Sequence, residues 1–198
     1  MKGCASSESV PTLRGDEVTR KILVAGGFGA GKTTLIGSVS QIPPVRTEET
    51  LTRAGIGIDH TELPGKTTTT VGMDFGRLHL SDDLVLYLFG APGQPRFFPI
   101  LKDLAHGALG ALVLVDTRRL HDTYPILELI EDLGLPYAVA VNRFDGAPEP
   151  TEERLREVMR LDPATPVAIC DARVRRTSLN ALIALVTYLV TLTPEPSR

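Results

Sequence analysis

The sequence predicts an α/β fold in which helices cover both faces of a doubly wound, mostly parallel sheet of six strands. Apolar runs alternate with amphipathic segments along the chain, and uninterrupted apolar runs are typical of strands buried on both faces. A glycine-rich loop, GGFGAGKTT, joins the first run to the first amphipathic segment. The chain has 198 residues and is 42% hydrophobic, enough for one sizeable core.

The predicted strands are apolar runs bounded by glycine, proline or polar residues. They cover 21–26, 71–80, 84–90, 110–116, 137–142 and 166–170. The second strand alternates in polarity and continues through LSDD into the third, which predicts a hairpin and hence one antiparallel edge strand. The predicted helices have apolar residues at helical spacing, and they cover 31–40, 95–107, 124–134, 151–161 and 178–192.

These elements predict one domain over 21–193, between a flexible tail at 1–20 and a short tail at 194–198. A net charge of -3 argues against nucleic-acid binding, which normally needs a basic surplus. Cys4 and Cys170 cannot build a disulfide framework, and no leader segment precedes the first strand, so we expect a cytoplasmic protein. Contact with a membrane would then come only through a partner.

The glycine-rich loop fits the pattern GxxxxGK[ST] at a turn from a strand into a helix. Its glycines let the backbone wrap a phosphate chain, and the helix N-terminus adds a positive end. Lys32 reaches the β- and γ-phosphates, and the Thr33 hydroxyl binds Mg²⁺. The sequence therefore predicts a site for a nucleoside polyphosphate and Mg²⁺ formed by Gly26, Gly29, Ala30, Gly31, Lys32, Thr33 and Thr34.

The end of a later buried strand carries VNRFD, at 141–145. This arrangement resembles the guanine-specificity motif of the Ras-like small GTPases. The Asp145 carboxylate can accept from both the ring N1–H and the 2-amino group of guanine, which adenine does not offer. By the same resemblance, Asn142 would support the P-loop and touch the purine, and Arg143 would stand where the family has lysine.

Three further motifs follow in the order of that family. TVGMDF at 70–75 resembles the first switch and places Thr70 on Mg²⁺ and the γ-phosphate. APGQ at 91–94 resembles the second switch, in which the Gly93 N–H would meet the γ-phosphate and Gln94 would position the attacking water. CDAR resembles the loop whose backbone N–H binds the guanine oxygen, and its contacting residues would be Asp171, Ala172 and Arg173.

Two departures from the family narrow the resemblance. Gly90 stands where the second switch usually has an aspartate that serves Mg²⁺, and Phe28 occupies a P-loop position that is usually small. The combination of LFGAPGQPRF with NRFD and CDAR resembles the bacterial small GTPases of the gliding-motility type, most closely the actinobacterial conservon ATP/GTP-binding proteins. The resemblance implies a roadblock-type regulator and a membrane histidine-kinase-like partner.

Two functions remain open at this point. Gln94, Lys32 and Thr70 favour a slow GTPase switch that a partner stimulates, whereas Gly90 and Phe28 favour a nucleotide-binding interaction module with negligible hydrolysis. A small-molecule P-loop kinase would leave the VNRFD and TVGMDF motifs unexplained. The sequence also offers Arg53 and Arg96, either as arginines for catalysis or as solvated surface residues. Phe97 and Phe98 are either an exposed aromatic anchor for the partner or rings that pack under the sheet.

Overall fold

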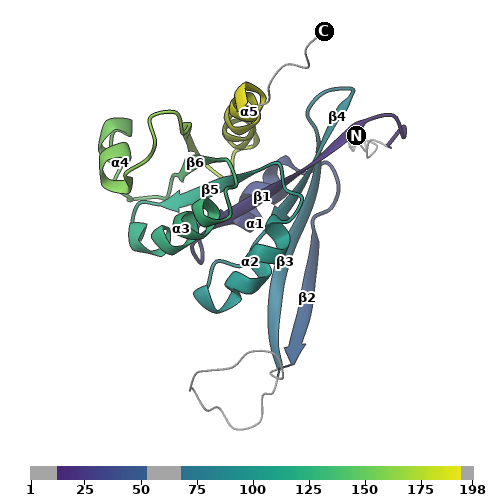
Figure 1. Cartoon of the computed structure of the whole chain (residues 1–198), viewed down its shortest axis with the longest axis horizontal. Coiled ribbons are helices and arrows are strands. Elements are labelled where there is room, and N and C mark those ends of the chain that lie inside the picture. Colours follow the sequence, from purple (N-terminus) through teal and green to yellow (C-terminus); the bar gives the residue numbers. More distant parts are fainter. Residues whose placement is uncertain (1–12, 53–67, 193–198) are drawn as a thin grey trace, which may run out of the picture.

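The computed structural model is a three-layer α/β domain built on one seven-stranded sheet (Figure 1). It describes residues 13–52 and 68–192. The strands are β1 (Val18–Gly26), β2 (Val45–Thr52), β3 (Thr68–His79), β4 (Leu84–Gly90), β5 (Gly110–Asp116), β6 (Tyr137–Asn142) and β7 (Val167–Cys170). The helices are α1 (Lys32–Val39), α2 (Phe98–Ala105), α3 (Tyr124–Asp132), α4 (Glu152–Met159) and α5 (Arg175–Leu192), with short 3-10 turns η2 (Pro95–Phe97) and η3 (Leu120–Asp122).

The sheet has the order β2-β3-β4-β1-β5-β6-β7. Strand β1 pairs in parallel with β4 and β5, and β6 pairs in parallel with β5 and β7, whereas β3 runs antiparallel to both of its neighbours. The α/β fold, its mostly parallel sheet and all six predicted strands are therefore confirmed.

The seventh strand, β2, corrects the predicted topology. It forms from VRTEETLT, a stretch outside all the predicted strands and helices, and pairs with the outer side of β3. The antiparallel strand β3 is consequently an interior strand and not an edge strand. The sequence did not reveal β2 because an edge strand can be held mainly by backbone hydrogen bonds and needs no continuous apolar run.

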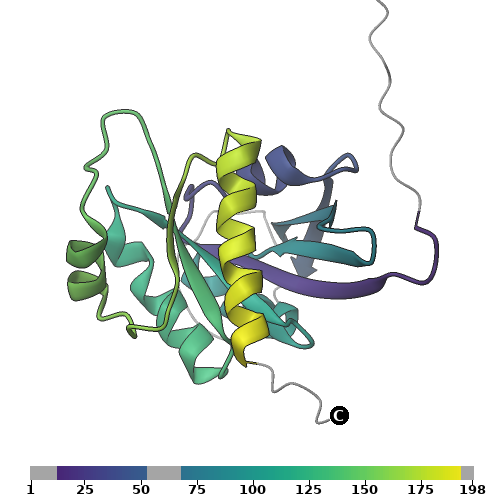
Figure 2. The ribbon, with the colours of Figure 1, turned by 90° about the horizontal axis from the view of Figure 1, so that it is seen from above.

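Two layers of core lie on opposite faces of the sheet, because successive side chains of a strand point to opposite faces. Ile22 and Val24 of β1 belong to the layer covered by α1 and α5, which lies across the strands in Figure 2. Leu23 and Ala25 belong to the layer covered by α2, α3 and α4. The loop between β1 and α1 follows the carboxyl end of β1. It therefore lies at the carboxyl edge of the parallel strands, where α/β proteins bind ligands.

Several predicted boundaries shift. Strand β1 begins at Val18, inside the predicted N-terminal tail, and α5 begins at Arg175. Strand β3 begins at Thr68, so Thr70 lies in a strand. Residues 1–12, 194–198 and Arg53 fall outside the described residues, so the two tail predictions are open there. Within 13–52 and 68–192, none of the helices has the length and apolar character needed to cross a bilayer.

Candidate nucleotide-binding site

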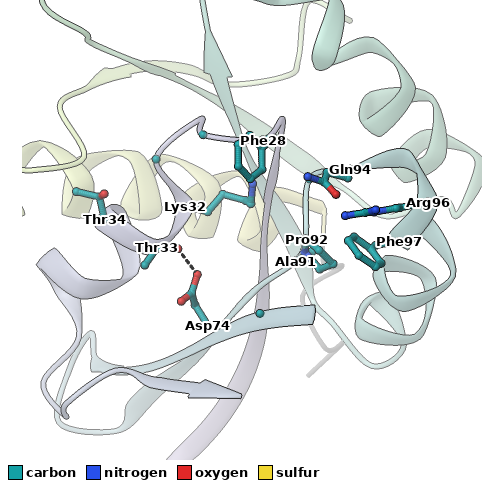
Figure 3. A pocket seen from close by; sticks show the side chains of 14 residues that line it. Phe28, Lys32, Thr33, Thr34, Asp74, Ala91, Pro92, Gln94, Arg96 and Phe97 are labelled. Atoms are coloured by element: carbon teal, nitrogen blue, oxygen red, sulfur yellow. Dashed lines mark hydrogen bonds between the residues drawn. The ribbon is translucent and has the colours of Figure 1, made fainter. Parts of the chain in front are cut away.

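A pocket of about 410 Å³ opens beside the N-terminus of α1 (Figure 3). Three segments that are distant in sequence form its wall: the P-loop with the start of α1, the strand β3, and the chain that follows β4. Seven of the residues expected from the sequence lie in the wall beside Asp74 and Phe28, namely Gly29, Gly31, Lys32, Thr33, Thr34, Gly93 and Gln94. Of these, Thr34 is exposed.

The P-loop turns into α1 at Gly31, whose φ of 104° is left-handed. Any side chain at this position would be strained and would also collide with the Asn142 amide. Helix α1 has no side-chain cap hydrogen bond at its N-terminus. Its first backbone N–H groups can therefore bind an anion, since a helix N-terminus carries partial positive charge and unpaired donors.

Lys32 is held inside the loop before any ligand binds. Its Nζ donates to the carbonyl oxygens of Gly26 and Gly27, at 2.8 Å each. Burial lowers the pKa of Lys32 to about 8, and the nearby Asp74 carboxylate opposes that shift. A polyphosphate would add negative charge to this half-buried site and stabilise the ammonium form.

Thr33 and Asp74 meet across the pocket floor. The Thr33 hydroxyl, in the first turn of α1, donates a hydrogen bond to Asp74 Oδ2 of β3 (Figure 3). Threonine and carboxylate oxygens suit the preference of Mg²⁺ for hard oxygen ligands. The residues present therefore fit the Mg²⁺ that the sequence predicts beside the phosphates. Asp74 was not among the predicted site residues.

The chain after β4 packs directly on the P-loop. Ala91 N–H donates to the Val24 carbonyl at 3.0 Å, which continues the line of the sheet. A Cβ at Gly93 would lie within 2.7 Å of Phe28 N and closer still to Gly26 O, so only glycine fits this approach. Phe28 lines the same pocket with 64% of its surface exposed.

Two arginines that follow β5 support the loops of the site. Neither was among the site residues that the sequence predicted. Arg119 Nη2 donates to the Phe28 carbonyl at 2.6 Å and so holds the outer side of the P-loop. Arg118 pairs with both oxygens of the buried Asp116, at 2.9 and 2.8 Å, and its guanidinium lies 3.8 Å from the Phe144 ring centroid. The pair lowers the pKa of Asp116 through hydrogen bonding. The only sequence signal was a polar cluster, DTRR, at the end of a buried strand.

Asn142 links the phosphate end of the site to its other end. The side chain is buried, its Nδ2 donates to the Ala30 carbonyl at 2.9 Å, and its Oδ1 accepts from the Ala172 N–H at 2.9 Å. The expected support of the P-loop by Asn142 is present. The expected contact of the Ala172 N–H with a base stays a prediction, because a base oxygen would have to share this donor or take it over.

Beyond Asn142 lies an exposed cluster of charges. Arg173 Nη2 lies 3.2 Å from Asp145 Oδ1 and 2.8 Å from Asp171 Oδ2. Hydrogen bonds from Arg173 lower the pKa of the Asp171 carboxyl. The Asp145 side chain is 91% exposed. Arg143 turns the other way and pairs with Glu149 at 3.2 Å.

The chain resembles known proteins in sequence and in fold. The model of a family described as conserved hypothetical ATP-binding proteins matches residues 24–192, from the last part of β1 to the end of α5. The chain belongs to this family of conserved hypothetical ATP-binding proteins. The matched span includes the P-loop, both predicted switches and the VNRFD and CDAR loops.

Solved structures share the fold of this ATP-binding family member. The G domain of the T. maritima FeoB iron transporter matches with a TM-score of 0.55 and 16% identity, over 88% of this chain and 98% of that one. The FeoB G domain of Methanococcus jannaschii gives 0.57 and 14%, over 87% and 98%. The predicted G-domain type of P-loop fold is therefore confirmed.

A curated relative is an elongation factor G-like protein of Synechocystis sp., 24% identical over 150 residues. The match covers 71% of this chain and 21% of that protein, so the chain spans about a fifth of the length of the relative.

The structure bears on three expectations about the switch regions: the aromatic pair, Arg96 and Thr70. Phe97 is buried, at 7% exposure, and Phe98 packs against the second core layer, so the expected exposed aromatic anchor was wrong. Phe97 ends η2 and Phe98 begins α2, so both rings lie where the chain turns against the sheet. Arg96 lines the pocket and stacks on the Phe97 ring at 4.7 Å. The side chain of Thr70 lies outside the described part of the structure, so its role stays a prediction.

Proposed function

We propose that this protein binds guanine nucleotides with Mg²⁺ and acts as a slow GTPase switch. The observation that carries the proposal is the Asn142 bridge, which ties the P-loop to the loop after β7. It sets a phosphate pocket on one side and the exposed Asp145 carboxylate on the other. A carboxylate accepts the paired N1–H and 2-amino donors of guanine, and adenine has no such pair.

At the phosphate end, Lys32 and the N–H groups of α1 bind the β- and γ-phosphates. Thr33 and Thr70 hold Mg²⁺, which when bound neutralises charge on the phosphates. The Gly93 N–H meets the γ-phosphate, and Gln94 orients the attacking water. The position of Gly93 against the P-loop and of Gln94 in the pocket wall supports these roles.

We further propose that the protein is of the gliding-motility type, with a roadblock-type regulator. LFGAPGQPRF, NRFD and CDAR support this branch. The regulator would bind the surface around 70–75 and 94–98 and raise a low intrinsic turnover. A sensor-kinase-like partner would connect the cytoplasmic protein to a membrane.

Base selectivity tests the proposal directly. Because the family is described as ATP-binding, GDP, GTP, ADP and ATP are titrated side by side in the presence of Mg²⁺. Guanine nucleotides should bind at least tens of times more tightly, since a pair of hydrogen bonds to a charged carboxylate contributes about 2–4 kcal/mol. Equal affinity for ATP and GTP would refute guanine selectivity.

A binding module with negligible hydrolysis is the second candidate. It is favoured by Phe28, whose ring stands in the pocket, and by Gly90, which brings no carboxylate to the metal. Multiple-turnover phosphate release, measured with and without the regulator, separates the two functions. A switch GTPase should be stimulated, and Gln94→Leu should abolish the stimulation while nucleotide binding persists. Turnover that stays at background under both conditions would establish the binding module.

A further inference from the structure

Asp74 and Gly90 are direct partners across the β3–β4 hairpin. Side chains of directly opposed residues lie on the same face of a sheet. A Cβ added at Gly90 would stand 3.0 Å from Asp74 Cβ and 3.3 Å from Asp74 Oδ2. The Asp74 carboxylate thus occupies the space that a side chain at position 90 would need.

From this place the carboxylate turns toward the P-loop. Asp74 Oδ2 accepts the proton of the Thr33 hydroxyl. A hydroxyl has one proton and two lone pairs, so a hydroxyl that donates to a carboxylate keeps both lone pairs for other partners. Thr33 is consequently held in the state in which it can ligate a cation in the pocket that both residues line.

We propose that Asp74 supplies the carboxylate of the Mg²⁺ site, in the place of the acid that the chain lacks at Gly90. The inference rests on the proposed binding of a Mg²⁺-nucleotide at this pocket. The acidic group of the metal site would then lie on β3, which pairs with a strand on each side, and not at the end of β4. The metal is then tied to the sheet and not to the loop at 91–94.

The competing explanation is that Asp74 merely fastens Thr33. Asp74→Asn separates the two roles, because an amide oxygen still accepts from the Thr33 hydroxyl but carries no charge. If Asp74 only fastens Thr33, the variant should keep the Mg²⁺ dependence of the unmodified protein. If it serves the metal, Mg²⁺ should bind less well while the fold persists.

The experiment follows dissociation of a fluorescent GDP while free Mg²⁺ rises from excess chelator to millimolar levels. For Asp74→Asn we expect the Mg²⁺ concentration that gives half-maximal slowing to rise about 10–100-fold, the usual cost of losing a group that supports metal ligands. The dissociation rate in chelator should change little. Asp103→Asn, an exposed charge on α2, is the matched control and should leave the curve in place.

Variants that place a carboxylate at position 90 sharpen the test. Gly90→Asp alone should not tighten Mg²⁺, because the new side chain meets Asp74 and Ile36, whose Cδ1 is 2.9 Å from the added Cβ. Asp74→Gly should lose Mg²⁺ dependence. Asp74→Gly combined with Gly90→Asp should recover part of it, because the glycine clears the Cβ and the carboxylate at position 74, and the Ile36 Cδ1 atom is the end of a side chain that can turn away. Melting temperatures verify that each variant folds.

Three outcomes would overturn the inference: an unchanged Mg²⁺ curve in Asp74→Asn, a tenfold tighter one in Gly90→Asp, or no recovery in the folded double variant. A failure of guanine selectivity is a separate result. If the protein binds ADP in place of GDP, the same variants are measured with fluorescent ADP, since the metal site lies beside phosphates common to both.

Discussion

At the phosphate end of the site, Lys32, Thr33 and Asp74 are half-buried and bonded to backbone or to one another, whereas at the base end Asp145 and Arg173 form an ion pair in solvent. A buried, bonded arrangement loses little freedom when a ligand arrives. An exposed ion pair contributes about 0–1 kcal/mol, so a base can displace it at small cost. Under the proposed function, we therefore expect the phosphates to contribute most of the affinity and the base to contribute the selectivity.

The largest effect is expected from Lys32→Ala, which tests the phosphate end. Hydrogen bonds to charged groups contribute about 1.5–3 kcal/mol each, so losing the Nζ contacts with two phosphates should weaken GTP binding at least 100-fold. Isothermal titration with Mg²⁺-GTP measures the effect, and Lys102→Ala on α2 is the control. A loss smaller than that of Asp145→Asn would reverse our ranking of the two ends.

Asp145→Asn tests the base end. We expect GDP to bind more weakly by about 2–4 kcal/mol, because the charge-assisted pair with guanine is lost. Xanthosine diphosphate, which offers an oxygen where guanine has its amino group, should bind the variant better than it binds the unmodified protein. Competition against fluorescent GDP measures both. Unchanged GDP affinity would remove Asp145 from the site.

Asn142→Ala tests the link between the ends. It leaves the Ala30 carbonyl and the Ala172 N–H without their side-chain partner, and each buried polar group without a partner costs about 1–3 kcal/mol. We expect a lower melting temperature and weaker binding of inorganic pyrophosphate as well as of GDP. Loss of GDP binding with intact pyrophosphate binding would show that the two ends are independent.

The smallest effect is expected from Arg173→Ala. Removing the guanidinium frees the Asp145 carboxylate, and the gain in GDP affinity should be small because the pair is exposed. Stopped-flow association of fluorescent GDP should accelerate by a few-fold at most, and added salt should erase the difference between the variant and the unmodified protein. Much slower association would instead assign Arg173 a direct contact with the nucleotide.

Much of the fold could be predicted, because the apolar runs that became β1, β5 and β6 are buried on both faces. Ile22 to Ala25 and Gly110 to Asp116 are examples, and their composition alone requires cover on two sides. The exception is β2, whose VRTEETLT sequence carries no such requirement. Pairing with β3 is a backbone contact, and nothing local in the sequence encodes it.

Within the site, the P-loop could be predicted residue by residue, because glycines, lysine and threonine at fixed spacing act through local backbone geometry. Counting back through the predicted hairpin from LSDD places Asp74 opposite Gly90, so this pairing follows from local sequence. The Arg119 contact with the Phe28 carbonyl joins residues far apart in the chain, and no pattern announces it.

By itself the sequence determined the α/β class, the position of the phosphate loop and the order of the motifs, since periodicity and spacing act over a few residues. Only the tertiary structure decided which groups meet. Strand register placed Asp74 against Thr33, the buried Asn142 joined the P-loop to the loop after β7, and Arg173 closed on Asp145. These contacts depend on how distant segments are brought together, and that is set by the packing of the whole sheet.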